Sequence, residues 1–181
     1  HSIPTLAVRV NDLCYSGDMR YDEDWFMQLE AEGLLSPERR EELTTEGGLD
    51  VVQKKKSLER IIPRLQTKGI EVSLFIDPEI RQVQAAKEAG AVAIERHTGT
   101  YANASRRRKR FELARLRGAA AEAHRLHLEI HAGHGLDYEN VTPVARIPYM
   151  KELNIGHSIV SRSIWAGMQR AVQEMKRKMR V

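Results

Sequence analysis

The stretch GIEVSLFIDPEIRQVQAAKEAGAVAIERHTG, residues 69–99, decides the fold class. Residues 69–77 are rich in β-branched and aromatic side chains and follow a glycine, which is typical of a strand. Pro78 is suited to the first turn of a helix, and an apolar stripe recurs at helical spacing until Gly90 ends it. Residues 91–95 are apolar again and predict a second strand. The stretch therefore reads as strand, helix, strand.

The same alternation continues to the end of the chain. We expect the following elements: a helix over 101–126, a strand over 128–131, a short helix over 138–145, a strand over 153–155 and a closing helix over 164–179. Strands that alternate with helices through short connections are parallel and are joined by helical crossovers. Both a doubly wound sheet and a barrel satisfy this pattern.

Polar residues at the strand ends favour the barrel. They are Asp77, Glu95, His97, His131, His134 and His157. A (β/α) barrel presents its chemistry at this end of its strands. A complete barrel needs at least about 200 residues, and this chain has 181. The fold class expected is therefore α/β, a parallel (β/α) barrel of TIM type that is incomplete or rearranged.

The first third of the chain is less regular. Residues 48–68 predict a helix that Pro63 kinks or nearly ends. Upstream of it, Thr5–Val10 is compatible with a strand, and Asp22–Leu35 is compatible with a helix capped by Asp22. We find no linker of low complexity and expect a single domain over residues 1–181.

The composition indicates the type of substrate and the cellular compartment to expect. Hydrophobic residues make up 41% and charged residues 30%, with a net charge of +4 that suits an anionic substrate. No apolar run approaches the roughly 18 residues of a membrane span, and we expect no signal peptide. The single cysteine, Cys14, fits a reducing cytoplasm.

Two glycine–histidine turns are the strongest functional signals in the sequence. Ala132-Gly133-His134-Gly135 and Asn154-Ile155-Gly156-His157 each follow an expected strand. Glycine lets the backbone approach an anion, helix N-termini bind phosphate, and histidine exchanges protons near neutral pH. Phosphate sites in barrels commonly use the loops after the last two strands. For either motif alone, a tight turn with a surface histidine is an equal alternative.

Glu95 and His97 share one face of their strand because side chains alternate. A carboxylate inside a barrel is costly unless it is paired or catalytic. The alternative interpretation is an ion pair with a basic neighbour. Thr44-Thr45-Glu46-Gly47-Gly48 is a weaker signal that suits a helix cap and turn equally well.

Two other clusters are assigned to the surface. The run Ser105–Arg110, SRRRKR, carries no interleaved aromatic side chains, so we interpret it as a solvated helix face and predict no nucleic-acid partner. His124 and His127 lie three residues apart near a helix end without a matching third ligand, so we predict no metal site.

Five motifs, in order, resemble the pyridoxine 5'-phosphate synthase family. They are TTEGGLDV at 44–51, VSLFID at 72–77, IERHTGTYANA at 94–104, HAGHGL at 131–136 and ELNIGHSIV at 152–160. The resemblance runs from about Pro37 to the C-terminus. It divides the chain into a divergent segment, 1–36, and a C-terminal barrel half, 37–181, that is similar to the family.

This resemblance implies a (β/α)8 barrel that assembles into octamers. The implied enzyme is a transferase of vitamin B6 biosynthesis. It condenses 1-deoxy-D-xylulose 5-phosphate with 3-amino-2-oxopropyl phosphate and releases pyridoxine 5'-phosphate, inorganic phosphate and water. No metal or organic cofactor is implied. By position, His134 matches the proton donor and Glu95 the residue that stabilises the transition state. Ligand-binding positions of the family match Thr44, Gly135, Gly156 and His157.

The sequence also departs from the family. The family carries a His–Arg pair and a glutamate that acts as a base on its early strands. Residues 1–36 contain no counterpart of these residues. The segment Leu6–Leu13 is similar to the first family strand, and Arg96 stands where the family prefers an apolar residue. A non-catalytic or engineered barrel derivative that keeps a phosphate half-site is therefore the alternative function. Because five or six strands leave open edges, we expect a homo-oligomer, at least a dimer.

Overall fold

The computed structural model describes residues 7–9 and 47–180. Its strands are β1 (Ala7–Arg9), β2 (Glu71–Ile76), β3 (Ala93–His97), β4 (Glu129–Gly133) and β5 (Met150–Asn154). Its helices are α2 (Val51–Gln66), α3 (Ile80–Glu88), α4 (Gly99–Asn103), α5 (Arg106–Arg125), α6 (Val141–Ala145), α7 (His157–Ala166) and α8 (Met168–Met179). The helix expected over 22–35 lies outside the described residues.

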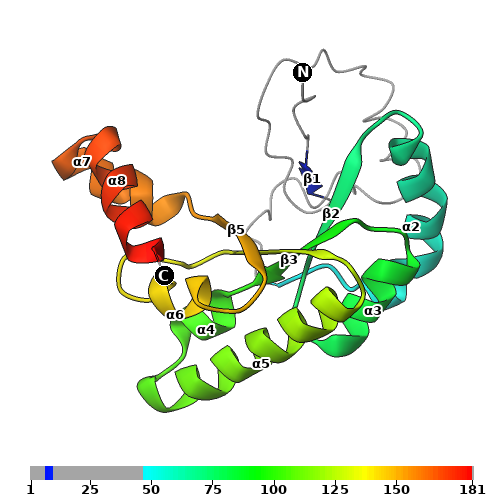
Figure 1. Cartoon of the computed structure of the whole chain (residues 1–181), viewed down its shortest axis with the longest axis horizontal. Coiled ribbons are helices and arrows are strands. Elements are labelled where there is room, and N and C mark those ends of the chain that lie inside the picture. The colour runs from blue at the N-terminus through cyan, green and yellow to red at the C-terminus, as the bar shows by residue number, and fades with distance from the viewer. Residues whose placement is uncertain (1–6, 10–46, 181) are drawn as a thin grey trace.

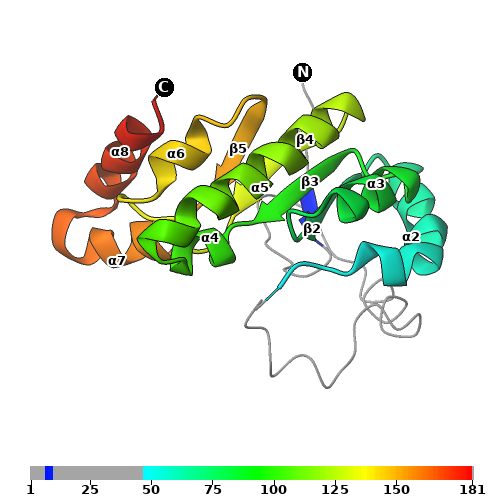
Figure 2. The same cartoon turned by 90° about the horizontal axis from the view of Figure 1, so that it is seen from below.

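All five strands form one parallel sheet in the order β1-β2-β3-β4-β5. Helices α2, α3, α5 and α6 lie along one face of it, and α7 and α8 stand together beyond β5 (Figures 1 and 2). The α/β fold of parallel strands and helical crossovers is confirmed. Within the described part of the chain, β1 and β5 are the two edges and the sheet does not close on itself.

The position of β1 differs from that of a first barrel strand. A first strand would pair with the last, yet β1 pairs with β2 through Ala7 opposite Glu71 and Arg9 opposite Ser73. β1 thus occupies the edge farthest from β5, where the strand before β2 in a barrel would lie.

The two faces of the sheet have different chemistry. One is packed under the helices and supplies the core with Val72, Leu74, Ile76, Ile94, Ile130 and Ala132. The opposite face, called the inner face here, carries a row of paired residues: Phe75, Glu95, His131 and Glu152. The next row toward the carboxyl ends is His97, Gly133 and Asn154. Alternation along each strand thus puts Glu95, His97, His131 and Glu152 on the face that the helices do not cover.

Two helices expected as continuous are each split in two. The helix over 101–126 is interrupted because Ala104 is extended, with ψ 141°, and Ser105 starts α5 afresh. The closing helix begins earlier than expected, at His157, and breaks at Gly167, whose φ of +78° is a conformation that glycine adopts readily. Pro63 lies inside α2, three residues before its end.

Arg96 is a buried guanidinium on the helix-covered face. It has no solvent exposure, donates to the backbone oxygen of Leu116 and lies 3.5 Å from the sulfur of Met150. Among the described residues, its Nε atom has no hydrogen-bond partner. Burial lowers the pKa of Arg96 to about 10. The charge is therefore held where it costs stability.

Replacing Arg96 by methionine is expected to raise the free energy of unfolding by about 1–3 kcal/mol. Methionine fills a similar volume, and the Leu116 oxygen keeps its place in α5 without the arginine. Urea denaturation of Arg96→Met against the exposed control Arg117→Met measures the difference. Lower stability of Arg96→Met would show that the buried guanidinium stabilises the fold, and equal stability would show that its burial has no net cost.

Candidate active site

The carboxyl ends of the parallel strands bring the strand-end residues to one edge of the sheet. Asp77 follows β2, His97 ends β3, His134 follows β4 and His157 follows β5 after a short loop. These residues are distant in sequence, and only the parallel register gathers them. The site predicted from the sequence is thus an edge of this sheet.

Glu95 is almost fully buried on the inner face, with 2% of its surface exposed. Its carboxylate lies against Gly133 of the neighbouring strand. A Cβ atom at Gly133 would stand 2.1 Å from Glu95 Oε1 and 3.0 Å from the backbone oxygen of Asn154. Gly133 therefore leaves the space that the carboxylate fills. The sequence indicated Gly133 only as part of a turn. Its role beside Glu95 follows from the pairing of its strand with the strand that carries Glu95.

His134 sits in a loop whose backbone is fixed on several sides. Its φ is +78°, followed by Gly135 at +76°. The Thr98 hydroxyl lies 2.6 Å from the backbone oxygens of both Gly133 and His134, and these two acceptors share its single proton. The Asn140 side chain donates to the Gly135 oxygen at 3.0 Å. A non-glycine residue at positive φ needs such support. These hydrogen bonds therefore hold the His134 loop in one defined conformation.

Gly135 also packs closely. A Cβ atom there would lie 2.8 Å from the Cβ of Ala102 in α4. The glycine is therefore needed for the fold of the loop whatever ligand the site binds.

Gly156 and His157 open α7 and are exposed. No side chain caps this end of the helix within the described residues, and a Cβ at Gly156 would meet nothing within 4 Å. The Ser158 hydroxyl donates to the Leu136 oxygen at 2.8 Å, which ties the start of α7 to the His134 loop. This hydrogen bond connects the two glycine–histidine turns. The space beside Gly156, in the second turn, is open.

Asp77 and His97 form a pair that sequence reasoning noted at the strand ends without assigning it a role. His97 Nδ1 lies 3.3 Å from Asp77 Oδ1. The backbone N–H of Gly48 donates to the same oxygen at 3.2 Å. The hydrogen bond from His97 is the main cause that lowers the pKa of Asp77.

The remaining residues noted in the sequence lie on the inner face, on the surface or outside the described part of the chain. His131 is buried in the Glu95 row, and its Nε2 lies 3.6 Å from Glu129. Thr44 lies outside the described residues. His124 stacks on Tyr149 with ring centroids 3.5 Å apart. In the part of the chain that the structure describes, no group of three or more His, Cys, Asp or Glu side chains could hold a metal ion.

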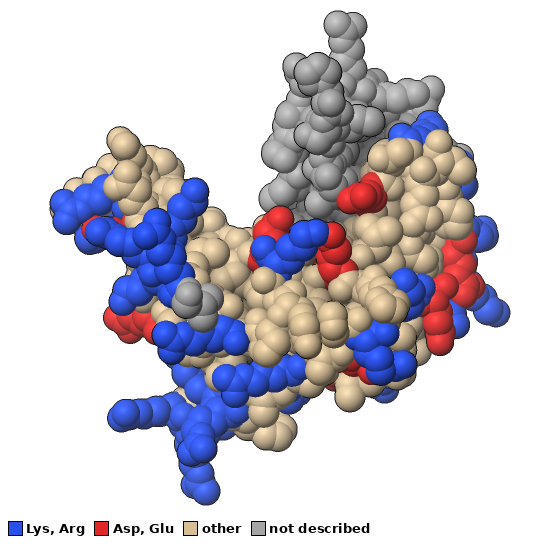
Figure 3. Space-filling view, in the orientation of Figure 1, with Lys and Arg blue, Asp and Glu red and all other residues tan. Residues whose placement is uncertain are grey.

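The surface carries basic side chains away from the strand ends. Figure 3 shows Lys and Arg gathered over α7, α8 and the start of α5, where four of the five residues of the run Arg106–Arg110 are exposed. Lys109 lies 5.6 Å from the ring centre of Tyr101. None of the helices in residues 7–9 and 47–180 combines the length and hydrophobicity needed to traverse a bilayer.

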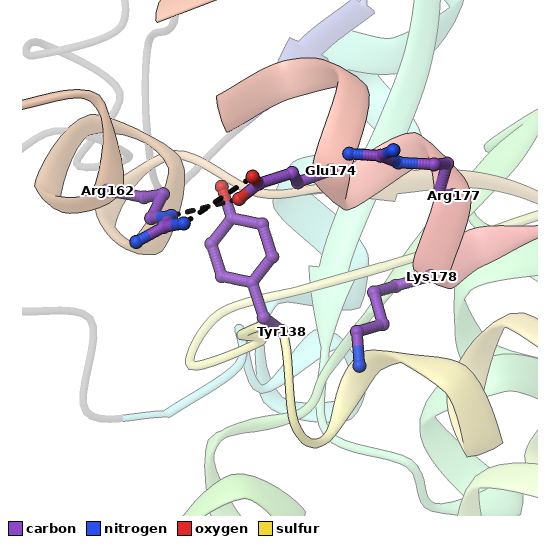
Figure 4. A pocket seen from close by; sticks show the side chains of 5 residues that line it. All are labelled: Tyr138, Arg162, Glu174, Arg177 and Lys178. Carbon is purple, nitrogen blue, oxygen red and sulfur yellow. Dashed lines mark hydrogen bonds and ion pairs between the residues drawn. The ribbon is translucent and has the colours of Figure 1, made fainter. Parts of the chain in front are cut away.

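A pocket of about 510 Å³ lies between the His134 loop and α8 (Figure 4). Its lining residues are Tyr138, Arg162, Glu174, Arg177 and Lys178. Glu174 accepts a hydrogen bond from Arg162 at 2.9 Å and also forms an ion pair with Arg170. The hydrogen bond from Arg162 is the main cause that lowers the pKa of Glu174 to about 2. Tyr138 donates to the Ala171 oxygen. These contacts hold α7 and the loop on α8, and none of the predicted site residues lines the pocket.

The sequence of this chain is similar to those of known proteins. The family model described as pyridoxal phosphate biosynthesis protein PdxJ matches residues 26–181. The chain belongs to the PdxJ family. Its sequence is 54% identical over 147 residues to the pyridoxine 5'-phosphate synthase of Magnetococcus marinus, covering 81% of this chain and 60% of that protein. It is 53% identical over 143 residues to the synthase of Akkermansia muciniphila, covering 78% and 58%.

The PdxJ chain therefore spans about 60% of the length of the curated relatives it matches. This ratio agrees with the open sheet: the five described strands are part of a TIM-type barrel and do not close it. Membership of the family confirms the resemblance carried by the five motifs.

Proposed function

We propose that this PdxJ chain is a pyridoxine 5'-phosphate synthase, which condenses 1-deoxy-D-xylulose 5-phosphate with 3-amino-2-oxopropyl phosphate. The observation that carries the proposal is the arrangement of Glu95, His134 and His157 on three neighbouring strand ends in a member of this family. Phosphorylated substrates suit the open glycine–histidine turn at α7.

Glu95 and His134 have the chemistry that the reaction needs. The condensation proceeds through imine formation, loss of water and ring closure, and each step moves protons. His134, exposed at the mouth of the site, serves as the proton donor. Glu95, buried and close to Gly133, stabilises positive charge that develops on the nitrogen of the condensing amine.

Phosphate binding is assigned to the start of α7. Backbone N–H groups in the first turn of a helix attract anions, and the N-terminal end of the helix dipole adds to that attraction. Gly156 and His157 occupy this turn, Gly135 lies in the adjoining loop, and Thr44 completes the ligand-binding set by its match to the family. No metal or organic cofactor takes part in the proposed reaction.

The direct test is to mix the two substrates with the purified chain and to look for pyridoxine 5'-phosphate by mass spectrometry. We expect the product together with released inorganic phosphate. Absence of product at high enzyme concentration would contradict the proposed activity and leave the fold unchanged.

Gly156→Val is expected to weaken binding of pyridoxine 5'-phosphate by about tenfold or more, or about 1.4 kcal/mol. The space beside Gly156 is open, so valine fits without a clash but covers the helix turn where the phosphate approaches. Calorimetric titration of the native chain and of the variant measures the change. Equal thermal unfolding midpoints are the control, and unchanged affinity would show that phosphate does not bind at this turn.

A non-catalytic derivative that keeps the phosphate half-site is the second candidate. The observation in its favour is that residues 1–36 contain no counterpart of the His–Arg pair and the Glu base that the family carries on its early strands. This candidate predicts binding of pyridoxine 5'-phosphate with no turnover. The same two experiments separate it from the synthase.

We also propose a homo-oligomer, with the cytoplasm as its location and no nucleic-acid partner. Large apolar side chains are exposed on and beside α7, with Trp165 at 87% and Ile164 at 75%. Helix α7 has no buried residue and packs mainly on α8. Exposed apolar surface and open sheet edges are both features that a second chain can cover. The reducing cytoplasm fits a chain with one cysteine.

Sedimentation at micromolar concentration is expected to give a dimer or a larger species. Trp165→Glu should shift the population toward the monomer, because a carboxylate in an apolar interface is costly. Gln169→Glu, an exposed change on α8 that adds the same single negative charge, is the control. A native chain that stays monomeric throughout the concentration range would contradict the assembly.

A further inference from the structure

His97 is a buried imidazole in contact with the candidate proton donor. Its ring centroid lies 4.8 Å from that of His134, with the rings tilted by 49°. The ring centroid of Phe75 also lies 5.2 Å from that of His97, and the two rings are nearly perpendicular at 76°. Only 6% of His97 is exposed, so its orientation is set by these neighbours.

Gly99 makes room for both imidazoles. A Cβ atom on Gly99 would stand 2.7 Å from His97 Nε2 and 3.1 Å from His134 Cδ2. Within the described residues, this buried Nε2 has no hydrogen-bond partner. The strand end and the start of α4 are thus shaped around two adjoining rings.

Asp77 fixes the other nitrogen of His97. The 3.3 Å contact from Nδ1 to Asp77 Oδ1 needs a proton on Nδ1, because a carboxylate only accepts. The lowered pKa of Asp77, caused first by the His97 hydrogen bond, keeps the carboxylate ionised at neutral pH. When His97 is neutral, a proton on Nδ1 leaves a lone pair at Nε2.

We infer that Asp77 and His97 form a positioning pair for His134, holding its ring in place and favouring its protonated form. The inference deepens the proposed function and rests on it for the role of His134 as proton donor. The mechanism is electrostatic: with His97 neutral, the pair carries the single negative charge of Asp77, which favours an imidazolium beside it. A carboxylate that orients a histidine, which in turn meets a reacting group, is a known arrangement in other catalytic sites.

Other charges near the pair come from three elements. Glu95 lies on the same face of β3, two residues before His97. Arg115 of α5 acts on Asp77 through space, but it is also held by Glu112 at 2.9 Å and lies 3.9 Å from Glu79. The Gly48 N–H before α2 contributes a dipole at Asp77. Removing the Asp77 charge alone therefore changes the field at His134 without breaking its loop.

The test uses histidine labelled with nitrogen-15 in the full chain and follows the His134 ring against pH by NMR. In Asp77→Asn, which removes this charge, the midpoint of the His134 titration is expected to fall by about half a pH unit or more. His124→Gln, which removes an exposed histidine of α5 stacked on Tyr149, should leave it unchanged. A His134 titration in Asp77→Asn that overlays the native one overturns the inference, as does a proton found on His97 Nε2 in the native neutral state.

Steady-state kinetics supply a second test, because a positioning role affects kcat rather than KM. In the active enzyme, Asp77→Asn should lower kcat by about 10- to 100-fold with little change in KM. A change confined to KM would overturn the positioning role. If the native chain forms no product, the proposed function fails and the NMR titration by itself decides whether Asp77 and His97 control His134.

Discussion

Replacing His134 by alanine is expected to lower kcat for pyridoxine 5'-phosphate formation by about 10²- to 10⁴-fold, the range that a positioned general acid contributes. The fold should survive, because the His134 side chain is exposed and its loop is held by hydrogen bonds from Thr98 and Asn140 to neighbouring backbone oxygens. Steady-state kinetics of native and variant chains, with matched circular dichroism spectra, measure the effect.

His157→Ala is the matched comparison for this variant. His157 is also an exposed histidine in a glycine–histidine turn, but it lies where we assign phosphate binding. Its loss should raise KM more than it lowers kcat. If the two variants show the same pattern, the separation into a proton donor and a phosphate site is wrong.

Gly133→Ala is expected to destabilise the protein by about 1–3 kcal/mol and to eliminate activity. The added methyl group would stand 2.1 Å from Glu95 Oε1, so the carboxylate must leave its position or the strands must separate. The backbone has little freedom to yield, because β4 is paired with β3 on one side and β5 on the other. Urea denaturation and the product assay measure the two losses.

Gly118→Ala provides the opposite control. Gly118 lies within α5, is exposed, and has open space where a Cβ would be. Alanine there should raise stability by about 0.5–1 kcal/mol, because glycine costs entropy in a helix. A Gly133→Ala chain as stable and active as the native one would show that Glu95 does not need the position described here.

The strands and their parallel order were predictable because their signals are local. Runs such as Val72–Ile76 are mostly apolar and rich in β-branched and aromatic side chains, and a segment with helical periodicity separates each run from the next. The histidines of the candidate site followed from the same signals, because parallel strands put all their carboxyl ends at one edge.

Features that depend on pairing between distant strands were not predictable in this way. The fit of Glu95 against Gly133 depends on the register of β3 and β4, and the partner of β1 depends on a choice between two edges. Breaks at Ser105 and Gly167 were missed because apolar periodicity continues across both. Nothing local to Arg96 indicates that it lies against Leu116.

The hydrogen bond from Ser158 to the Leu136 oxygen has a consequence for how the proposed enzyme uses its substrate. It fastens the turn that would hold a phosphate to the loop that carries the proton donor. Attraction between the helix end and the non-reacting phosphate group would then help to order the acid that acts on the carbon skeleton. A substrate without its phosphate would lose turnover rate as well as affinity, because remote binding energy is spent at the reacting centre.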